Sequence, residues 1–162
     1  MRSKEFVDYL FSLLGKDKGL RACFKRADNE AYEWKTWQVL RRFVDLEHDD
    51  ERRAFALIGA CIAKSKQGAN GSVGLGRACR IAAGNKDDVF SPRFMRLLSA
   101  ESADELLVVL RPSLAYLANK CGNLDYAGIL DDILAFKWRR EKIRVCWAKD
   151  YLNNDDGEVD DE

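Results

Sequence analysis

The sequence has few of the residues that most often carry metal or hydrolytic chemistry. Its 162 residues include a single histidine, His48, and none of its five cysteines stands in a C-x-x-C pair. Zinc sites of the usual kind need paired His or Cys ligands, and a Ser-His or Cys-His catalytic pair would have to use His48, in the polar segment LEHDDERR. These counts argue against most common hydrolytic and metal chemistry, and we expect no metal and no cofactor.

Signals for disulfides and membranes are missing as well. The cysteines are odd in number and far apart, each beside small or apolar residues, which is typical of reduced, buried cysteines in a cytoplasmic protein. No uncharged run exceeds ten residues, about half of what a bilayer span needs. Acidic residues interrupt the apolar stretch MRSKEFVDYLFSLLG, so we expect neither a secretory signal nor a membrane partner. The five cysteines are Cys23, Cys61, Cys79, Cys121 and Cys146.

Strand patterns are absent too, and helical patterns take their place. Leu, Ala, Arg, Lys and Glu recur at helical spacing, which predicts an all-α fold, a compact helical bundle of about eight or nine helices. The predicted helices are Ser3–Leu14, Gly19–Ala27, Ala31–Leu46, Asp50–Ser65 after an N-cap at Asp49, Gly74–Ala83, one opening at Ser91–Pro92, one with a capping box of Ser102 and Glu105 and a kink or restart at Pro112, Asp125–Phe136, and Arg140–Leu152.

A single helical domain is predicted over residues 1–152. The segment KSKQGANGS, residues 64–72, is a clear loop, and 66–73 is where a boundary would fall if the bundle has two lobes. Residues 153–162, NNDDGEVDDE, hold six acids and a single valine, so they cannot pack and are predicted to be a disordered acidic tail.

Charge is distributed unevenly along the chain. Basic and acidic residues number 27 each, and a net charge of zero at first argues against a nucleic-acid partner. All 27 basic residues, however, lie in 1–152 with 21 of the acids, so this body carries +6 and the tail −6. Three basic islands, Lys16–Arg26, Arg52–Arg96 and Lys137–Lys149, could converge on one phosphate-binding surface. The alternative is a set of solvated helix faces.

Two short motifs have both a functional and a structural interpretation. GSVGLGRAC, residues 71–79, follows no predicted strand and lacks the order of a phosphate-binding loop, so we interpret Gly76 as a close-packing residue. The pairs Asp87/Asp88 and Asp131/Asp132 could serve a metal or acid–base chemistry, but adjacent side chains on a helix point about 100° apart. We expect Asp131 and Asp132 to make ion pairs or subunit contacts.

The four tryptophans, Trp34, Trp37, Trp138 and Trp147, alternate with Lys and Arg, a pattern that suits base stacking. Their helical spacing with Leu and Ile favours core packing for Trp37 and Trp147. Trp138, between Lys137 and Arg139, fits either interpretation.

Four segments, in order along the chain, resemble one known family. GLRACFKRA (19–27) resembles a G-x-x-A-x-x-R-R-A helix, and SVGLGRAC (72–79) resembles an S-x-G-x-A/G-R-A/L helix start. SPRFMRLLSAESADELLVVLRPSLAYL (91–117) resembles R-R-x-F-x-x-L-L followed by L-R-x-x-L, and LDYAGILDDILAFK…REKIRVCWAKDYL (124–152) resembles D-[WY]-x-x-L-x-x-D-L-x-x-W…R-x-x-W-x-x-D-[FY]. Over residues 16–152 this ordered set is similar to the small subunit of the type I-E CRISPR Cascade complex, the CasB family. Phe136 replaces a usual Trp, and Pro112 interrupts the L-R-x-x-L helix.

The resemblance implies an all-helical, non-catalytic subunit in antiviral defence, present in two copies beside the backbone and large subunits of Cascade. It implies contact with crRNA and target DNA, chiefly the displaced non-target strand, which stabilises the R-loop. The residues that we expect to bind nucleic acid are Lys25, Arg26, Arg52, Arg53, Arg77, Arg80, Arg93, Arg96, Arg139, Arg140 and Arg144.

Three other classes of protein stay open. A helical scaffold or adaptor would bind only proteins, through basic islands that match acidic partner surfaces. An enzyme would use Asp131 and Asp132 with a divalent metal. A helix-turn-helix regulator would need a compact basic recognition helix, of which GSVGLGRACRIAAG is a poor version.

Overall fold

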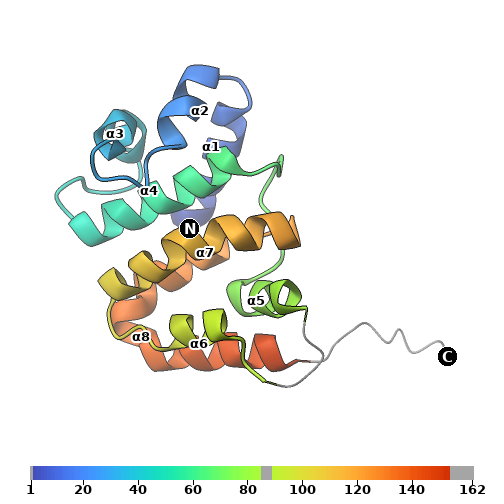
Figure 1. Ribbon diagram of the computed structural model, residues 1–162. Coiled ribbons are helices and arrows are strands. Elements are labelled where there is room, and N and C mark those ends of the chain that lie inside the picture. The colour runs from blue at the N-terminus through green and yellow to red at the C-terminus, as the bar shows by residue number, and fades with distance from the viewer. Residues whose placement is uncertain (1, 85–88, 154–162) are drawn as a thin grey trace.

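Eight α-helices and one 3₁₀ helix form the regular structure of residues 2–84 and 89–153, the part of the chain that the computed structural model describes. These residues contain no strand; Val73 and Leu124 form an isolated bridge. The prediction of an all-α fold with eight or nine helices is confirmed (Figure 1). The elements are α1 (Arg2–Leu14), α2 (Lys18–Phe24), η1 (Glu33–Thr36), α3 (Trp37–Leu40), α4 (Asp49–Lys64), α5 (Leu75–Ala83), α6 (Pro92–Leu98), α7 (Ala103–Cys121) and α8 (Tyr126–Leu152).

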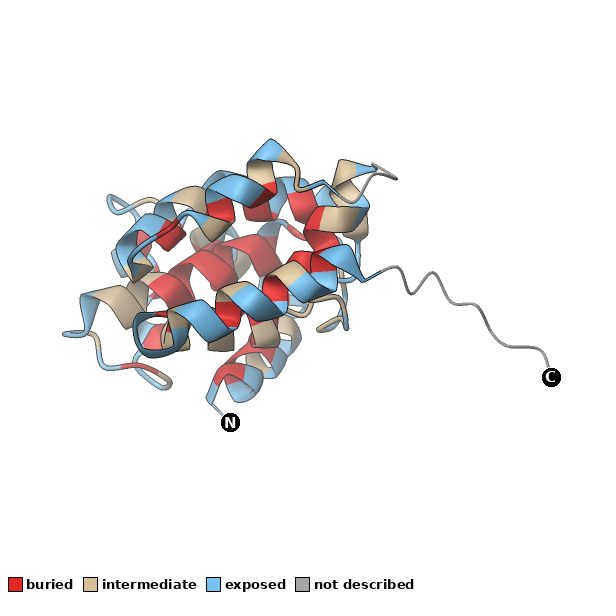
Figure 2. Cartoon of the chain, turned by 90° about the horizontal axis from the view of Figure 1, so that it is seen from below, coloured by how far each residue is buried: buried red, intermediate tan, exposed pale blue. Residues whose placement is uncertain are grey.

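Helix α4 runs through the middle of the bundle. Its residues Ala54–Ala63 are all buried, because α1, α2, α7 and α8 pack around it. In Figure 2 the buried residues, in red, accordingly fill the centre of the bundle. A helix covered on every side must be apolar all round, and this run holds no charged residue. At Gly59 the lack of a side chain lets α2 approach, since a Cβ there would collide with the ring of Phe24.

The predicted N-terminal caps at Ser91 and Ser102 are confirmed. The Ser91 hydroxyl accepts from the Phe94 amide at 3.2 Å, with Pro92 at the first helical position, and the Ser102 hydroxyl accepts from the Glu105 amide at 3.1 Å. The return half of the predicted capping box differs, because the Glu105 carboxylate accepts from the amide of Glu101 at 2.8 Å.

Two helix predictions in the first third of the chain are wrong. The predicted helix Ala31–Leu46 is instead η1 followed by the four residues of α3. The Thr36 hydroxyl donates to the Glu33 carbonyl at 2.7 Å and so competes with helical backbone bonding. Asp49 does not cap α4: His48 occupies the N-cap position, and Asp49 instead accepts from Arg52 at 2.8 Å.

Helices α7 and α8 differ in whether their backbone is continuous. Helix α7 continues through Pro112 as one helix, so of the predicted kink or restart the restart does not occur. Helix α8 bends at Arg139, whose φ of −127° and ψ of 24° are not helical. This bend confirms the predicted division between a helix ending near Phe136 and one beginning at Arg140.

The connection between α4 and α5 lies against the turn that joins α7 to α8. The Gly71 amide donates to the Leu124 carbonyl at 2.9 Å, and the Val73 amide donates to the Asn123 carbonyl at 3.0 Å. A Cβ on Gly71 would collide with the backbone of Asn123, so this close approach requires glycine. The suggested lobe boundary at 66–73 falls in this connection and stays a prediction. Of the predicted tail, residues 154–162 lie outside the described part of the chain.

Candidate nucleic-acid interface

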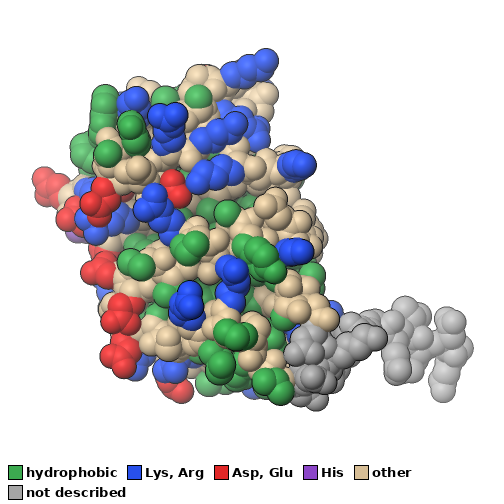
Figure 3. Space-filling model, in the orientation of Figure 1, with side chains coloured by type: hydrophobic (Ala, Val, Ile, Leu, Met, Phe, Trp, Pro, Cys, Tyr) green, Lys and Arg blue, Asp and Glu red, His purple; other side chains and the backbone are tan. Residues whose placement is uncertain are grey.

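On the side of the bundle that faces the viewer in Figure 3, basic side chains lie over the region that α2, α4, α6 and α7 occupy in Figure 1. Near α2, Lys25 is exposed and the Arg26 guanidinium lies 5.4 Å from the ring centroid of Tyr32. In the middle, Lys64 and Arg111 both pair with Asp28. We define the basic face as Lys25, Arg26, Lys64, Arg93, Arg111 and Lys120.

Helix α7 joins the two halves of the basic face. Arg111 is turned toward α2 and α4, because its Nε lies 3.4 Å from an Asp28 carboxylate oxygen that Lys64 Nζ also approaches, at 3.2 Å. Tyr116 is turned toward α6, because the Arg93 guanidinium lies 4.0 Å from its ring centroid. The ammonium of Lys120, one turn further along α7, lies 5.8 Å from the same centroid.

Helix ends account for two cations of the basic face. Lys64 and Lys120 occupy the last turns of α4 and α7, where the helix dipole favours cations. The first turns of the same helices hold acids, among them Asp50 and Asp104. In Figure 3 the acidic side chains correspondingly gather along the left margin, where α4 and α7 begin in Figure 1. Along both helices the charge therefore changes from acidic at the first turn to basic at the last turn.

Five of the residues expected from the sequence lie on or beside this face. Lys25, Arg26 and Arg93 are part of it, and Arg96 is exposed on α6, three positions after Arg93. Arg53 lies on α4 toward the acidic margin and pairs with Glu30 at 3.4 Å, a contact between two largely solvated side chains.

Another expected group lies elsewhere, at the bend of α8. Lys137 Nζ is 3.2 Å from a carboxylate oxygen of Asp50, and Arg140 donates to the Glu101 carbonyl at 2.9 Å, so both sit at the starts of α4 and α7. Lys64 lies at the other end of α4, about 21 Å away at 1.5 Å per residue. We call Lys137, Arg139, Arg140 and Arg144 the α8 cluster. The structure does not bring this cluster together with the basic face.

The remaining pair, Arg77 and Arg80, projects from α5 toward the end of α8. Arg77 donates to the Asn153 carbonyl at 3.1 Å, and the Arg80 guanidinium lies 5.6 Å from the ring centroid of Tyr151. The expectation that all three basic islands meet on one surface is therefore modified: residues of the first two islands, joined by Arg111 and Lys120 from α7, form the basic face, and the third forms the α8 cluster.

Comparison with known proteins places this chain in a family. The family model described as CRISPR-associated protein Cse2 matches residues 20–152, which is most of the chain. The chain belongs to the Cse2 family. The resemblance expected from the sequence is thereby confirmed.

A solved structure agrees with this assignment at the level of the fold. The Cse2-family chain is similar to the crystal structure of CasB from Thermus thermophilus, with a TM-score of 0.66 and 24% sequence identity. The match covers 92% of this chain and 96% of that one. No curated protein sequence matches the chain.

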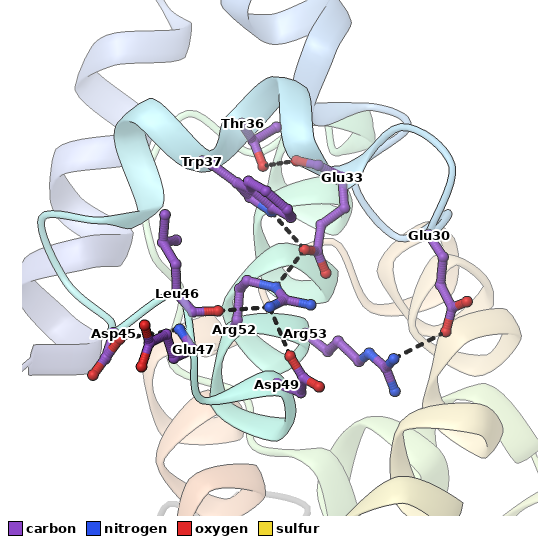
Figure 4. Close-up of polar contacts among 10 residues, drawn as sticks. All are labelled: Glu30, Glu33, Thr36, Trp37, Asp45, Leu46, Glu47, Asp49, Arg52 and Arg53. Carbon is purple, nitrogen blue, oxygen red and sulfur yellow. Dashed lines mark hydrogen bonds and ion pairs between the residues drawn. The ribbon is translucent and has the colours of Figure 1, made fainter.

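Arg52 of this Cse2-family chain serves the interior rather than the surface (Figure 4). Its Nε donates to the Glu33 carboxylate at 2.7 Å, and its Nη1 donates to the Leu46 carbonyl at 2.6 Å and to Asp49 at 2.8 Å. The guanidinium also lies 5.2 Å from the ring centroid of Trp37. Burial alone would lower the pKa of Arg52, but the bonds to Glu33 and Asp49 raise it, so the charge is held inside the protein. These contacts tie α4 to η1.

Asp132, one of the carboxylate pair on α8, has a structural role that differs from the expected ion pair. Asp132 accepts from the Trp147 indole at 2.8 Å and thereby joins the two halves of α8 across the bend. Burial raises the pKa of Asp132 to about 6. Within the described residues no group of three or more His, Cys, Asp and Glu side chains is placed to hold a metal, and no helix is long and apolar enough to cross a membrane. Asp87 and Asp88 lie outside the described residues.

Gly76 is a close-packing residue, as predicted. A Cβ there would collide with the backbone of Trp147, so α5 and α8 touch at this point. The cysteine prediction holds in part: Cys61 and Cys79 are buried, and burial raises the pKa of each thiol to about 12. Cys146, by contrast, is exposed, and that prediction is wrong.

The tryptophans divide differently from the prediction. Trp147 is buried, as expected, with 2% of its surface exposed, but Trp37 is 37% exposed because its ring covers the Arg52 guanidinium from the solvent side instead of packing in the core. Trp34 and Trp138 are exposed to 57% and 70%.

Sequence reasoning missed Lys64, Arg111 and Lys120 as members of the basic face. Lys64 lies within the basic island Arg52–Arg96, and Arg111 is the arginine of the L-R-x-x-L motif, so both carried a weak signal. Arg21 of α2 is not part of the basic face, because it donates to the Ala63 and Ser65 carbonyls at 3.0 Å and so satisfies the end of α4.

Proposed function

We propose that this Cse2-family chain is a non-catalytic small subunit of a crRNA-guided type I-E CRISPR (Cascade) complex in antiviral defence. In this proposal it lies beside the backbone and large subunits and a second copy of itself. Its basic face holds nucleic-acid backbone, chiefly the displaced non-target DNA strand, and so stabilises the R-loop. Membership of the Cse2 family supports the setting, and the basic face supports the mode of binding.

Charge on the basic face is the observation that carries the binding mode. Lys64 and Arg111 share the single carboxylate of Asp28, so this trio keeps a net positive charge in the middle of the face. Cations of this kind bind phosphates without reading sequence. Exchange of a DNA duplex for a guide–target duplex is nearly balanced in free energy, so backbone contacts by a protein can shift it. Arg52 is left out of the proposed surface because its guanidinium bonds inside the protein.

Charge reversal on the basic face tests the proposal. Arg93→Glu and Arg111→Glu should each weaken retention of target DNA by the assembled complex, while the preference for guide-matched sequence stays unchanged. The salt dependence of single-strand binding should fall by about 0.7 in logarithmic slope for each phosphate that the variant no longer neutralises. The matched control is Lys4→Glu, the same charge change at an exposed position of α1, which packs behind α4 in Figure 1.

A variant with the opposite effect sharpens the test. Asp28→Asn keeps the shape of the side chain but releases Lys64 and Arg111 from their shared carboxylate. Binding of single-stranded DNA should then become tighter and more sensitive to salt. If charge reversal and charge release both leave retention at the level of the control across a salt titration, the basic face is not the binding surface.

The α8 cluster is tested separately with Arg144→Glu, since it lies apart from the basic face. A loss of DNA retention here, with none at Arg93 and Arg111, would move the proposed surface to the bend of α8. The adaptor alternative predicts a third pattern: no single-strand binding by the free protein, and R-loops that persist in every charge-reversed complex.

A further inference from the structure

Two exposed aromatic residues, Tyr32 and Trp34, follow Arg26 of the basic face along the chain, and the Arg26 guanidinium lies over the Tyr32 ring. Trp34 is 57% exposed and Tyr32 is 36% exposed, although Glu33 and Thr36 beside them in the sequence are buried. The short η1 turn explains this: Glu33 and Thr36 of the same turn are buried, so the residues between and before them point outward. In Figure 3 hydrophobic and basic side chains lie beside one another over the region of α3.

Cations surround these rings. The Lys35 ammonium lies 5.5 Å from the ring centroid of Tyr32 and 5.8 Å from that of Trp34, and the Arg26 guanidinium lies 5.4 Å from Tyr32. A hollow of about 230 Å³ opens on the Tyr32 side of this group, lined by Ala22, Cys23, Arg26, Tyr32 and Lys35, with no acid in its lining. Aromatic faces beside cations are the combination that single-stranded nucleic acid requires, because bases stack on the rings and phosphates pair with the charges.

Neighbouring Trp37 has a different role. Its indole N–H donates to the Glu33 carboxylate at 2.7 Å, and the Arg52 guanidinium lies 5.2 Å from its ring centroid. Trp37 therefore anchors η1 to α4. With its neighbour anchored, Trp34 is held on a short rigid turn rather than on a loose loop, which lowers the entropy cost of stacking.

We propose that Tyr32 and Trp34 form a stacking site for one or two unpaired bases of a single strand whose phosphates lie on Arg26 and Lys35. This inference rests on the proposed function and adds to it a preference for unpaired over paired DNA. In a duplex each base is covered by its neighbours, so the rings could engage only a strand that has been displaced. The stacking is independent of base identity, because every base has an aromatic face.

The experiment compares two single-stranded probes on the full-length chain. One is an oligothymidine, and the other is an abasic oligonucleotide of the same length and charge. Trp34→Ala should weaken binding of the oligothymidine about five- to hundredfold, the size expected for losing one stacked base, and leave the abasic probe unaffected. Trp34→Phe should retain most of the affinity, and Lys35→Ala should weaken both probes and lower the salt slope.

Controls separate this inference from the proposed function. Trp138→Ala removes an aromatic side chain that is 70% exposed and has a lysine ammonium 4.7 Å from its ring centroid, and it should change neither affinity. Thermal unfolding confirms that each variant is folded. If the native chain binds both probes equally well and Trp34→Ala changes neither, backbone binding stands and the stacking site is refuted. If the native chain binds neither probe, the proposed nucleic-acid binding fails as well.

Discussion

Arg52 and Arg53 are adjacent in the sequence yet have opposite environments. The Arg52 side chain is 14% exposed and pairs with Glu33, whose side chain is 7% exposed. The Arg53 side chain is 42% exposed and pairs with Glu30, whose side chain is 80% exposed. Removing one partner of a buried ion pair lowers stability strongly, because the other charge is left buried and unpaired. A solvent-exposed ion pair contributes little to stability. Residue type and position in a basic island therefore do not by themselves assign a binding role.

This difference gives a stability prediction. Arg52→Met should lower the free energy of unfolding by about 3 kcal/mol, because it leaves the Glu33 carboxylate buried without its charge partner. Arg53→Met should change it by less than about 1 kcal/mol. Urea unfolding followed by circular dichroism measures both values. Equal effects at the two positions would contradict the structural role of Arg52.

A double variant shows whether the loss comes from the stranded carboxylate. Arg52→Met combined with Glu33→Gln removes both charges, and the glutamine oxygen can still accept from the Trp37 indole. We expect this combination to be more stable than Arg52→Met alone. Any loss of DNA binding in Arg52→Met should disappear at temperatures where the variant is fully folded.

At the scale of the elements, local signals predicted the caps at Ser91 and Ser102 but misplaced the start of α4 at Asp49. Ser91 with Pro92, and Ser102, were predictable because a cap bonds within three residues of itself. The predicted helix Ala31–Leu46 fails because a side-chain bond at Thr36 and a pair with distant Arg52 decide its backbone. The spacing of apolar residues within one segment carries no information about a partner residue on another element.

The candidate site shows the same division. Lys25, Arg26 and Arg93 could be predicted because they fall within basic islands and family motifs. The gathering of Lys64 and Arg111 around Asp28 could not, because it depends on how α4 and α7 pack. The distance between the α8 cluster and the basic face could not be predicted either. It arises because Lys137 pairs with Asp50 at the start of α4, whereas Lys64 lies at the end of the same helix.

Helix α8 carries a pH-dependent contact between its two halves. Burial raises the pKa of Asp132 to about 6, the Trp147 hydrogen bond lowers it in part, and the negative charges of Asp131, Asp125 and Asp150 raise it again. An unfolded aspartate titrates near pH 3.9, so the folded state holds this proton more tightly. The contribution of Asp132 to stability is thus full below about pH 4 and is lost as the pH rises through about 6.

Asp132→Asn should remove this dependence. Asparagine stays uncharged and its oxygen can accept from the Trp147 indole, so the variant should be more stable than the native chain at pH 7 to 8. Below about pH 4 the two should converge. Urea unfolding at stepped pH gives the comparison, and Glu141→Gln, at a side chain 80% exposed on the same helix, is the control. Parallel pH profiles for the native chain and the variant would show that folding does not raise the pKa of Asp132.

At the scale of the whole molecule, net charge conceals the distribution that matters. Equal totals of 27 basic and 27 acidic residues give zero, yet six of the acids lie in residues 153–162 and the other 21 share residues 1–152 with every basic residue. A body of +6 attached to a segment of −6 creates an internal competitor for any polyanion. The segment is therefore expected to weaken binding of nucleic acid to the basic face.

Deleting residues 154–162 tests this competition, with Asn153 retained because its carbonyl accepts from Arg77. The shortened chain should bind single-stranded DNA more tightly at low salt, and the advantage should fade as the Debye length falls from about 30 Å at 0.01 M to about 3 Å at 1 M. A chain of unchanged length with its six acids replaced by Asn and Gln should behave like the deletion, because the effect depends on charge rather than on bulk. If the deletion tightens binding but the neutral chain does not, the segment acts by steric exclusion. If neither variant changes the affinity at low salt, the segment does not compete for the basic face, and its charge serves solubility.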